Sequence, residues 1–508
     1  MGLSDHRDLS PDTMSVVPAD EAHSSSSRHS LPVLRRDHPN LSRIALLAAG
    51  LAPPALYFLF VAHYGVNFIY WDEWAVVPLI NAELHGSLTF TMLWAQHNEN
   101  RMLLPNVLFV LSGRFDHFDT RAIMFLSASL YTLSFWLYLA IHKTYAGRSL
   151  RPLPILLTGC VWFSLEDFEN ALWGFQLAWF LIVFLLMILL FLFSRRRITN
   201  LGLSISILVA AAASISSLQG LILWPVGFLC LIWRTPGRTR LIKLSSVWVS
   251  ATAGCSFFYF WNFRFGAEAT GGGSVSFALR HPVEVVRYFF IAIGNLFPVN
   301  LSLNVFRTVS EELAMYECIG VVIFAVAVFV VWASYRRYRA ERRVPLPAAL
   351  ILFAVCFDIS IALGRVSLGL GVARSSRYTM ANLLMLVAIA SYYFGSPILR
   401  AAHADKRAWL SVVIPETMIA VVLVAQIWVT VPYGYSHGKS LAGQRNRGAQ
   451  VVVNLAEGTP PERAWDVYTL VYPGLPAAAP LLREAKKDQL SVFYPPLYRY
   501  YRHLGFPR

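Results

Sequence analysis

Two adjacent carboxylates, Asp72 and Glu73, stand between two tryptophans, directly after the first long apolar stretch of this sequence. Paired carboxylates can accept and donate protons in catalysis. They also suit the first turn of a solvated helix, where acids stabilise the helix dipole. Because tryptophans concentrate at membrane interfaces, the pair favours a functional role at a membrane surface. The same loop continues to His97 and Glu99, and a simple hydrogen-bonding cap is the alternative reading of His97.

A second group of acids occupies the short segment 164–176, which contains Glu166, Asp167 and Glu169 and no basic residue. Like charges this close repel, so such a cluster usually needs a cation, a proton or a donor-rich ligand. The alternative is that the three carboxylates only keep the loop solvated.

The segment 364–377 has the opposite charge, with Arg365, Arg374 and Arg377, several glycines and no acid. Glycine lets the backbone approach a ligand closely, and the planar guanidinium group binds phosphate through paired hydrogen bonds. The competing interpretation is that these arginines reach outward to lipid headgroups. We predict that the segment binds a phosphate.

The composition indicates that a membrane holds these segments. Of 508 residues, 56% are hydrophobic and 14% are charged, whereas soluble chains carry about 25% charged residues. This excludes an ordinary soluble enzyme, a disordered chain and a secreted disulfide scaffold. The excess of 43 basic over 29 acidic residues does not indicate nucleic acid as a partner, because basic residues accumulate in cytoplasmic loops. The five cysteines lie in or beside apolar runs without metal-binding spacing, so we expect neither a disulfide nor a zinc site.

Eleven stretches are apolar enough to be predicted as membrane-spanning helices, which need about 20 residues. These stretches are 44–64, 118–141, 152–165, 177–194, 201–218, 220–233, 245–262, 313–333, 346–363, 378–398 and 409–431. Five connecting loops hold 18 Lys/Arg and two acids, namely 142–151, 195–200, 234–244, 334–345 and 399–408. The positive-inside rule makes these loops and the N-terminus cytoplasmic. We therefore expect a multi-pass protein of the plasma (inner) membrane with an extracytoplasmic C-terminus.

Three regions follow from this topology. They are a disordered cytoplasmic tail over 1–40, a transmembrane domain over 41–431, and an extracytoplasmic C-terminal region over 432–508 with one predicted helix at 474–489. The outer loops of the transmembrane domain are 65–117, 164–176, 263–312 and 364–377. The apolar stretch 287–303 is expected to lie against the membrane within the third outer loop, because a twelfth span would break the charge rule.

This layout resembles the GT-C superfamily of membrane glycosyltransferases, which includes protein O-mannosyltransferases, aminoarabinose transferases and oligosaccharyltransferase subunits. The resemblance covers most of 40–400. It rests on Asp72-Glu73 after the first span, the helix-like stretch ending at Gly86, the stretch 103–113, the acidic second loop, and Arg377-Tyr378 before a span. The sequence departs from the family where a His-Pro-Pro-Leu-like stretch is replaced by His97-Asn-Glu-Asn-Arg-Met-Leu-Leu, and where the second loop lacks Asp-x-Asp.

The resemblance implies an all-α polytopic fold that transfers a sugar from a polyprenyl-phosphate donor to a lipid, glycan or protein acceptor at the outer face of the membrane. Asp72 would deprotonate the acceptor hydroxyl and Glu73 would orient it, while positive groups stabilise the departing phosphate. The residues assigned to the acceptor side, or to a divalent cation such as Mg²⁺ or Mn²⁺, are Glu166, Asp167, Glu169, His97 and Glu99. Those assigned to the donor phosphate are Arg365, Arg374 and Arg377. The missing Asp-x-Asp leaves the need for a metal open.

Two other classes of function stay open. A transporter or flippase of lipid-linked saccharides would need ionisable residues along its spans, and here Asp358 and Glu416 are the clearest of few. No internal repeat of the kind found in many transporters is present. A non-catalytic partner in a polysaccharide assembly complex is the third class.

Overall fold

The computed structural model describes residues 39–147, 150–195, 197–264, 274–298, 308–338, 342–395, 406–459, 467, 469–471 and 475–504. Within these residues the regular structure is helical apart from one hairpin, β1 (Gln96–His97) and β2 (Asn100–Arg101). The all-α prediction is therefore confirmed for the described part of the chain. Almost all of the predicted tail 1–40 lies outside the described residues.

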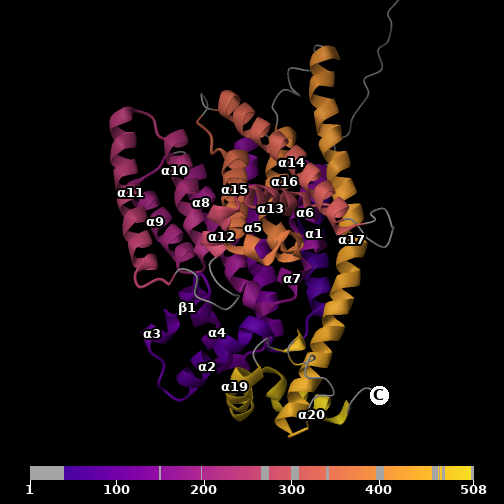
Figure 1. The fold of residues 1–508 in the computed structure, drawn as a ribbon. Helices are drawn as coiled ribbons and strands as arrows, with labels where there is room; N and C mark the ends of the chain where they lie inside the picture. Colours follow the sequence, from indigo (N-terminus) through magenta and orange to yellow (C-terminus); the bar gives the residue numbers. More distant parts are fainter. Residues whose placement is uncertain are drawn as a thin grey trace, which may run out of the picture.

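Seven helices in the described chain are long and apolar enough to cross a membrane (Figure 1). They are α1 (Pro39–Tyr64), α5 (Thr120–Ala146), α8 (Leu177–Ser194), α11 (Arg238–Phe260), α14 (Val309–Tyr338), α15 (Leu346–Arg365) and α17 (Lys406–Ala456). The other four predicted spans form shorter helices, which are α6 (Pro152–Trp162), α9 (Asn200–Ser214), α10 (Leu223–Arg234) and α16 (Thr379–Phe394). Every predicted span is thus helical and the protein is multi-pass, but a count of eleven spans is not established.

The first loop, residues 65–117, folds into a small helical layer at one end of the bundle, drawn in indigo at the bottom of Figure 1. Its elements are the 3₁₀ helix η1 (Trp71–Val76), α2 (Val77–Leu84), α3 (Phe90–Leu93), the β1–β2 hairpin and α4 (Leu103–Asp116). The predicted helix ending near Gly86 and the predicted helix at 103–113 are both present. Apolar residues of this layer form a second core with the C-terminal region, separate from the core of the bundle.

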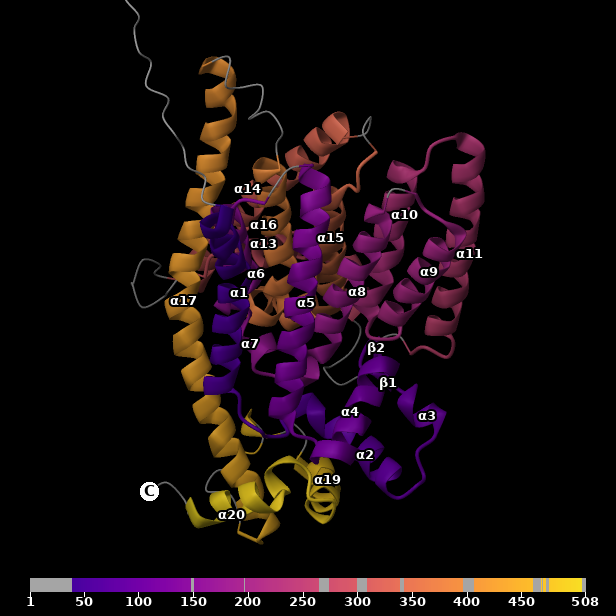
Figure 2. The same ribbon diagram turned by 180° about the vertical axis from the view of Figure 1, so that it is seen from behind.

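The C-terminal region covers this layer (Figure 2). The predicted last span ends at 431, but α17 continues unbroken to Ala456, so the C-terminal region is tied to the bundle by a continuous helix. Beyond it, α19 (Leu475–Lys487), η10 (Ser491–Phe493) and α20 (Pro495–Leu504) follow. The side chain of Asn81 donates to Asp488 at 2.8 Å, and Ser491 Oγ donates to Asn67 Oδ1 at 2.8 Å.

Of the stretch 287–303 predicted to lie against the membrane, residues 287–294 form the second half of α13 (Pro282–Gly294), which follows α12 (Ser274–Arg280), and 299–303 lie outside the described residues. Ile291, Ala292 and Ile293 are buried. Gly294 faces the backbone of α14 so closely that a side chain there would overlap it. Small residues allow such close approach between membrane helices, so α13 packs within the bundle.

Candidate functional site

An open cavity of about 270 Å³ lies where four distant segments meet at the end of the bundle occupied by the first loop. Each segment contributes part of the wall. The first loop gives Trp71, Asp72, His97 and Glu99, and the second loop and the start of α8 give Phe175, Gln176 and Trp179. Ser217 and Gln219 come from the start of the 3₁₀ helix η4 (Leu218–Ile222), and Arg365, Arg377 and Tyr378 come from the glycine-rich segment. Five predicted site residues therefore line one cavity, namely Asp72, His97, Glu99, Arg365 and Arg377.

Asp72 is held in the cavity wall by an unusual backbone conformation just before it. Trp71 has φ +49°, a left-handed conformation that a bulky residue rarely adopts. The C-terminal segment stabilises it, because Trp71 N donates to Val471 O at 2.9 Å and the indole donates to Thr469 O at 3.3 Å. The Asp72 side chain is 36% exposed, and its Oδ1 lies 3.7 Å from His97 Nε2.

His97 and Glu99 are presented by the β1–β2 hairpin, in which His97 pairs with Asn100. The hairpin is fixed by Arg101, which is 5% exposed. Its guanidinium donates to the carbonyls of Trp94, Tyr259 and Trp261 at 2.8, 2.8 and 2.6 Å. A buried charge with this many hydrogen bonds is costly to move, so the hairpin is anchored to the end of α11.

The two arginines that line the cavity differ in what they bind. Arg365, at the end of α15, lies with Nη2 3.3 Å from Glu99 Oε2. Arg377, in the 3₁₀ helix η8 (Ser376–Tyr378), lies over the Tyr378 ring at 5.3 Å. The buried Nε of Arg377 has no hydrogen-bond partner among the described residues. Because a buried donor without a partner is costly, Arg377 is the arginine best prepared to receive an anion.

Glu169 positions the turn that carries Arg377. Its Oε2 accepts hydrogen bonds from Ser375 Oγ at 2.7 Å, from Ser376 Oγ at 3.1 Å and from the backbone N–H of Arg377 at 3.1 Å. The charges of Glu169 and Asp72 also act on the Arg377 guanidinium. The acidic second loop and the basic last loop are therefore bound to each other.

The remaining acids of the second loop lie away from the cavity wall. Glu166 and Asp167 are 0% and 1% exposed. Burial raises the pKa of both carboxyls well above their usual values, and neighbouring acids raise it further. Asn295 donates to Glu166 at 3.3 Å, and Asn170 donates to Asp167 at 2.5 Å. Glu166 and Asp167 do not line the main cavity, and their predicted acceptor or cation role stays a prediction. The described residues contain no group of three or more His, Cys, Asp or Glu that could hold a metal ion.

Glu73 is also buried behind the cavity. Its carboxylate accepts from the backbone N–H of Tyr70 at 2.8 Å and of Phe175 at 3.1 Å, so it ties the first loop to the second. Burial raises the pKa of Glu73 to about 7, although the Arg445 charge and these two hydrogen bonds lower it. Glu73 thus holds the backbone of the Asp72 turn in place, and its side chain does not line the cavity.

Arg374, the third predicted phosphate ligand, is engaged elsewhere. Its Nη1 lies 2.5 Å from Oε2 of Glu312, which is 3% exposed. Asn295 donates to the Arg374 carbonyl at 3.0 Å. This pair fixes the glycine-rich segment to the start of α14, so Arg374 has a structural contact in place of a position in the cavity wall.

Sequence reasoning missed a polar wall of the cavity formed by Ser217 and Gln219. Ser217 Oγ donates to Asn100 Oδ1 at 2.8 Å, and the Leu218 N–H donates to the same oxygen at 3.1 Å. The signal was available, because Ser216 and Ser217 are polar residues at the end of the predicted span 201–218, and Gln219 alone separates that span from the next.

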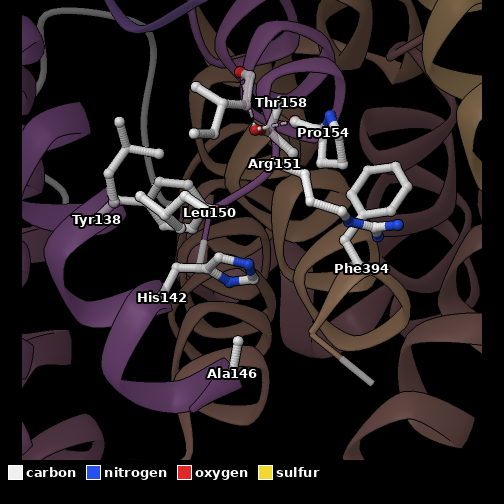
Figure 3. Close-up of a pocket in the computed structure, with 10 residues that line it drawn as sticks. Tyr138, His142, Ala146, Leu150, Arg151, Pro154, Thr158 and Phe394 are labelled. Carbon is white, nitrogen blue, oxygen red and sulfur yellow. Dashed lines mark hydrogen bonds between the residues drawn. The ribbon is translucent and has the colours of Figure 1, made fainter. Parts of the chain in front are cut away.

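A smaller cavity is lined by Tyr138, His142, Arg151 and Phe394 (Figure 3). Its volume is about 20 Å³, which is room for about one water molecule. Arg151, in its wall, pairs with Glu416 at 3.0 Å. This cavity is too small to admit a substrate. The ion pair with Arg151 accounts for an ionisable residue, Glu416, within a predicted span.

No protein-family model matches the sequence, and no curated protein matches it. Two solved structures are similar. The archaeal oligosaccharyltransferase AglB from Archaeoglobus fulgidus, in complex with an inhibitory peptide and a dolichol-phosphate, is 14% identical with a TM-score of 0.41, over 85% of this chain and 60% of that chain. The Archaeoglobus fulgidus oligosaccharyltransferase tethered with an acceptor peptide is 13% identical with a TM-score of 0.41, over 84% of this chain and 59% of that chain.

This chain therefore spans about three fifths of the length of those two proteins. Oligosaccharyltransferase subunits are among the members of the GT-C superfamily that the sequence resembles. A TM-score of 0.41 is too low to carry an argument about function.

Proposed function

We propose that the chain is a membrane glycosyltransferase that moves a sugar from a polyprenyl-phosphate donor to an acceptor hydroxyl at the outer face of the membrane. The observation that carries this proposal is the single cavity in which Asp72 and His97 share walls with Arg365 and Arg377. Glycosyl transfer from a phosphate needs a base for the nucleophile and positive charge for the leaving group. Both are available here within one space.

Asp72 is the proposed base. It is partly exposed in the cavity, as a group that contacts substrate must be. It takes the proton of the acceptor hydroxyl while the acceptor oxygen forms a bond with the anomeric carbon. Beside it, the imidazole of His97 limits where the carboxylate can lie, with Nε2 3.7 Å from Asp72 Oδ1. Glu73 holds the turn in place from behind.

Arg377 is the proposed ligand of the leaving phosphate. As the bond between the anomeric carbon and the phosphate oxygen breaks, the electron pair stays on the phosphate, and the guanidinium neutralises the added charge. Arg365 adds positive charge to the same phosphate after its ion pair with Glu99 opens. That pair is partly exposed, so breaking it costs about 0.2–1 kcal/mol. Trp179 and Tyr378 supply aromatic surface in the same wall.

A second cavity beside His97 offers a separate place for the acceptor. A neighbouring cavity of about 160 Å³ shares His97, Met102 and Phe175 with the main cavity. Donor and acceptor can therefore reach the base from different sides, as a two-substrate transfer requires. The chemistry proposed here uses Asp72 and the two arginines of the main cavity and routes no step through a metal ion.

The test is reconstitution of the full chain in liposomes that contain a polyprenyl-phosphate sugar and an acceptor lipid extract. Asp72→Asn keeps the shape of the side chain but removes its basic charge, so transfer should fall by about 10²–10⁴, the usual contribution of a general base. The matched control is Glu83→Gln, which changes a carboxylate of the same loop that pairs with Arg114 at 2.7 Å outside the cavity.

Equal transfer by wild type and Asp72→Asn would exclude Asp72 as the base. Movement of the intact sugar lipid between leaflets, without transfer and insensitive to Asp72→Asn, would favour the flippase alternative instead.

A further inference from the structure

A cluster of arginines lines a cavity of about 400 Å³ at the opposite end of the bundle from the Asp72 cavity. Its walls are Arg197, Ile198, Arg234, Thr235, Pro236, Arg240 and Arg342. None of these described residues is an acid. Arg197 lies between α8 and α9, Arg234 ends α10, Arg240 lies in the first turn of α11, and Arg342 lies between α14 and α15.

The arginines also hold these three connections together. The Arg234 guanidinium donates to the carbonyls of Arg195 and Arg342. Arg240 donates to the Ile198 carbonyl at 2.6 Å. Backbone carbonyls orient the guanidinium groups but do not neutralise their full charges. The fold therefore gathers four positive charges around one cavity. Basic loop residues that only set the membrane topology do not need to be gathered in this way, because they can stay dispersed in solvent.

The depth of the cavity matches a membrane surface. The apolar helix α8 ends at Ser194, directly before Arg195, and α10 ends at Arg234 itself. The arginines thus begin where two apolar helices stop, and we place this level at the lipid headgroups.

We propose that this arginine cavity binds the phosphate of an anionic phospholipid headgroup. Four guanidinium groups repel one another, and one phosphate relieves that repulsion while accepting paired hydrogen bonds. Ile198 and Pro236 give the apolar side of the cavity that the glycerol part of a lipid would contact. A free phosphate compound offers the same anionic group without the tails, so the experiment separates the two sources.

The test uses the full chain purified in a neutral detergent and measures retained lipid by native mass spectrometry. Phosphatidylglycerol and phosphatidylcholine are added in equal amounts. The wild type should retain phosphatidylglycerol selectively. The double variant Arg197→Gln/Arg240→Gln should lose that selectivity, by about fivefold for each arginine removed. The variant Arg197→Lys/Arg240→Lys should recover only part, because an ammonium group cannot form the planar paired contact.

The matched control is Arg238→Gln/Arg336→Gln, which removes the same charge at the same end from residues outside the cavity wall. It should keep the selectivity. Unchanged retention by the cavity variant, or an equal loss in the control, would overturn the proposal by showing diffuse attraction only. If the double variant does not fold, Arg240→Gln alone serves, because Arg240 is exposed.

Sodium pyrophosphate then distinguishes the source of the phosphate. Failure to displace phosphatidylglycerol from the wild type assigns the cavity to the lipid. Displacement together with stabilisation of the lipid-free protein overturns the lipid assignment and identifies a soluble phosphate compound as the ligand. This inference does not depend on the proposed transferase activity, since its readout is lipid retention.

Discussion

Oδ1 of Asp72 lies 3.7 Å from Nε2 of His97, although the two residues belong to different elements of the first loop. The contact exists because η1 is held by the C-terminal segment and the hairpin is held by Arg101. A catalytic carboxylate that meets an imidazole in this way gains a fixed orientation toward the cavity. The proposed base is thus positioned by two independent anchors.

We expect His97→Ala to lower kcat about 10- to 100-fold, since misplacement of a catalytic group costs up to about 10² in rate. His97→Gln should recover part of the rate, because an amide of similar length offers Asp72 a polar N–H₂ group in the same wall. The KM for the donor should stay close to wild type. A change in donor KM with kcat intact would instead place His97 among the phosphate ligands. The assay is steady-state transfer with donor and acceptor varied separately.

Glu169→Ala should raise the donor KM about 10- to 100-fold with little effect on kcat. The reason is that it removes the acceptor of three hydrogen bonds that hold the turn before Arg377, at about 1.5–3 kcal/mol for bonds to a charged group. Glu169→Gln keeps an acceptor oxygen and should recover much of the affinity. A drop in kcat with unchanged KM would show that Glu169 acts in the chemistry itself.

The sequence predicted the helices of the bundle well, because each span is a continuous apolar run whose length the membrane dictates. It also identified Asp72, His97, Glu99, Arg365 and Arg377, which share one cavity. The sequence feature that identified them was charged residues flanked by aromatic residues or glycines, a combination that a purely connecting loop does not require.

The sequence could not separate cavity residues from buried neighbours of the same type. Glu73 follows Asp72 directly, yet the 3₁₀ turn of η1 directs one carboxylate into the cavity and the other toward backbone N–H groups. Arg374 and Arg377 lie three residues apart in the same loop, but only Arg374 forms an ion pair with the buried Glu312. A partner distant in sequence contributes to each outcome, Phe175 for Glu73 and Glu312 for Arg374, and local spacing does not encode such partners.

The buried carboxyl of Glu73 should make stability depend on pH. Its folded-state pKa is raised to about 7 from 4.5, so between these values the folded chain binds more protons than the unfolded chain. Stability from this group therefore falls as pH rises through that range, by about 3 kcal/mol at most. Glu73→Gln removes the titration, so the stability of wild type relative to this variant should decline from pH 5 to pH 8.

Thermal unfolding midpoints in detergent measure this difference. The variant should itself be less stable at pH 5, because its amide places an N–H₂ group against one of two backbone N–H donors, and a buried donor left unpaired costs about 1–3 kcal/mol. Parallel pH profiles for wild type and Glu73→Gln would show that Glu73 keeps its ordinary pKa.

Arg377 gives the sharpest test of the phosphate site, because the chain offers Arg374 as a matched comparison three residues away. Arg377→Ala should weaken donor binding by about 2–5 kcal/mol, the usual cost of losing one partner of a charge-assisted contact in a partly desolvated site. Arg377→Lys should recover only part, since its ammonium group lacks the planar fork. Arg374→Ala should lower the unfolding midpoint, because it leaves the buried Glu312 without its ion pair, yet donor affinity per folded molecule should stay near wild type. Equilibrium binding of a polyprenyl-phosphate sugar to purified protein distinguishes the two variants. Donor affinity that is unchanged in Arg377→Ala, or lost equally in Arg374→Ala, would mean that the arginines of this loop serve its structure and that the phosphate binds elsewhere.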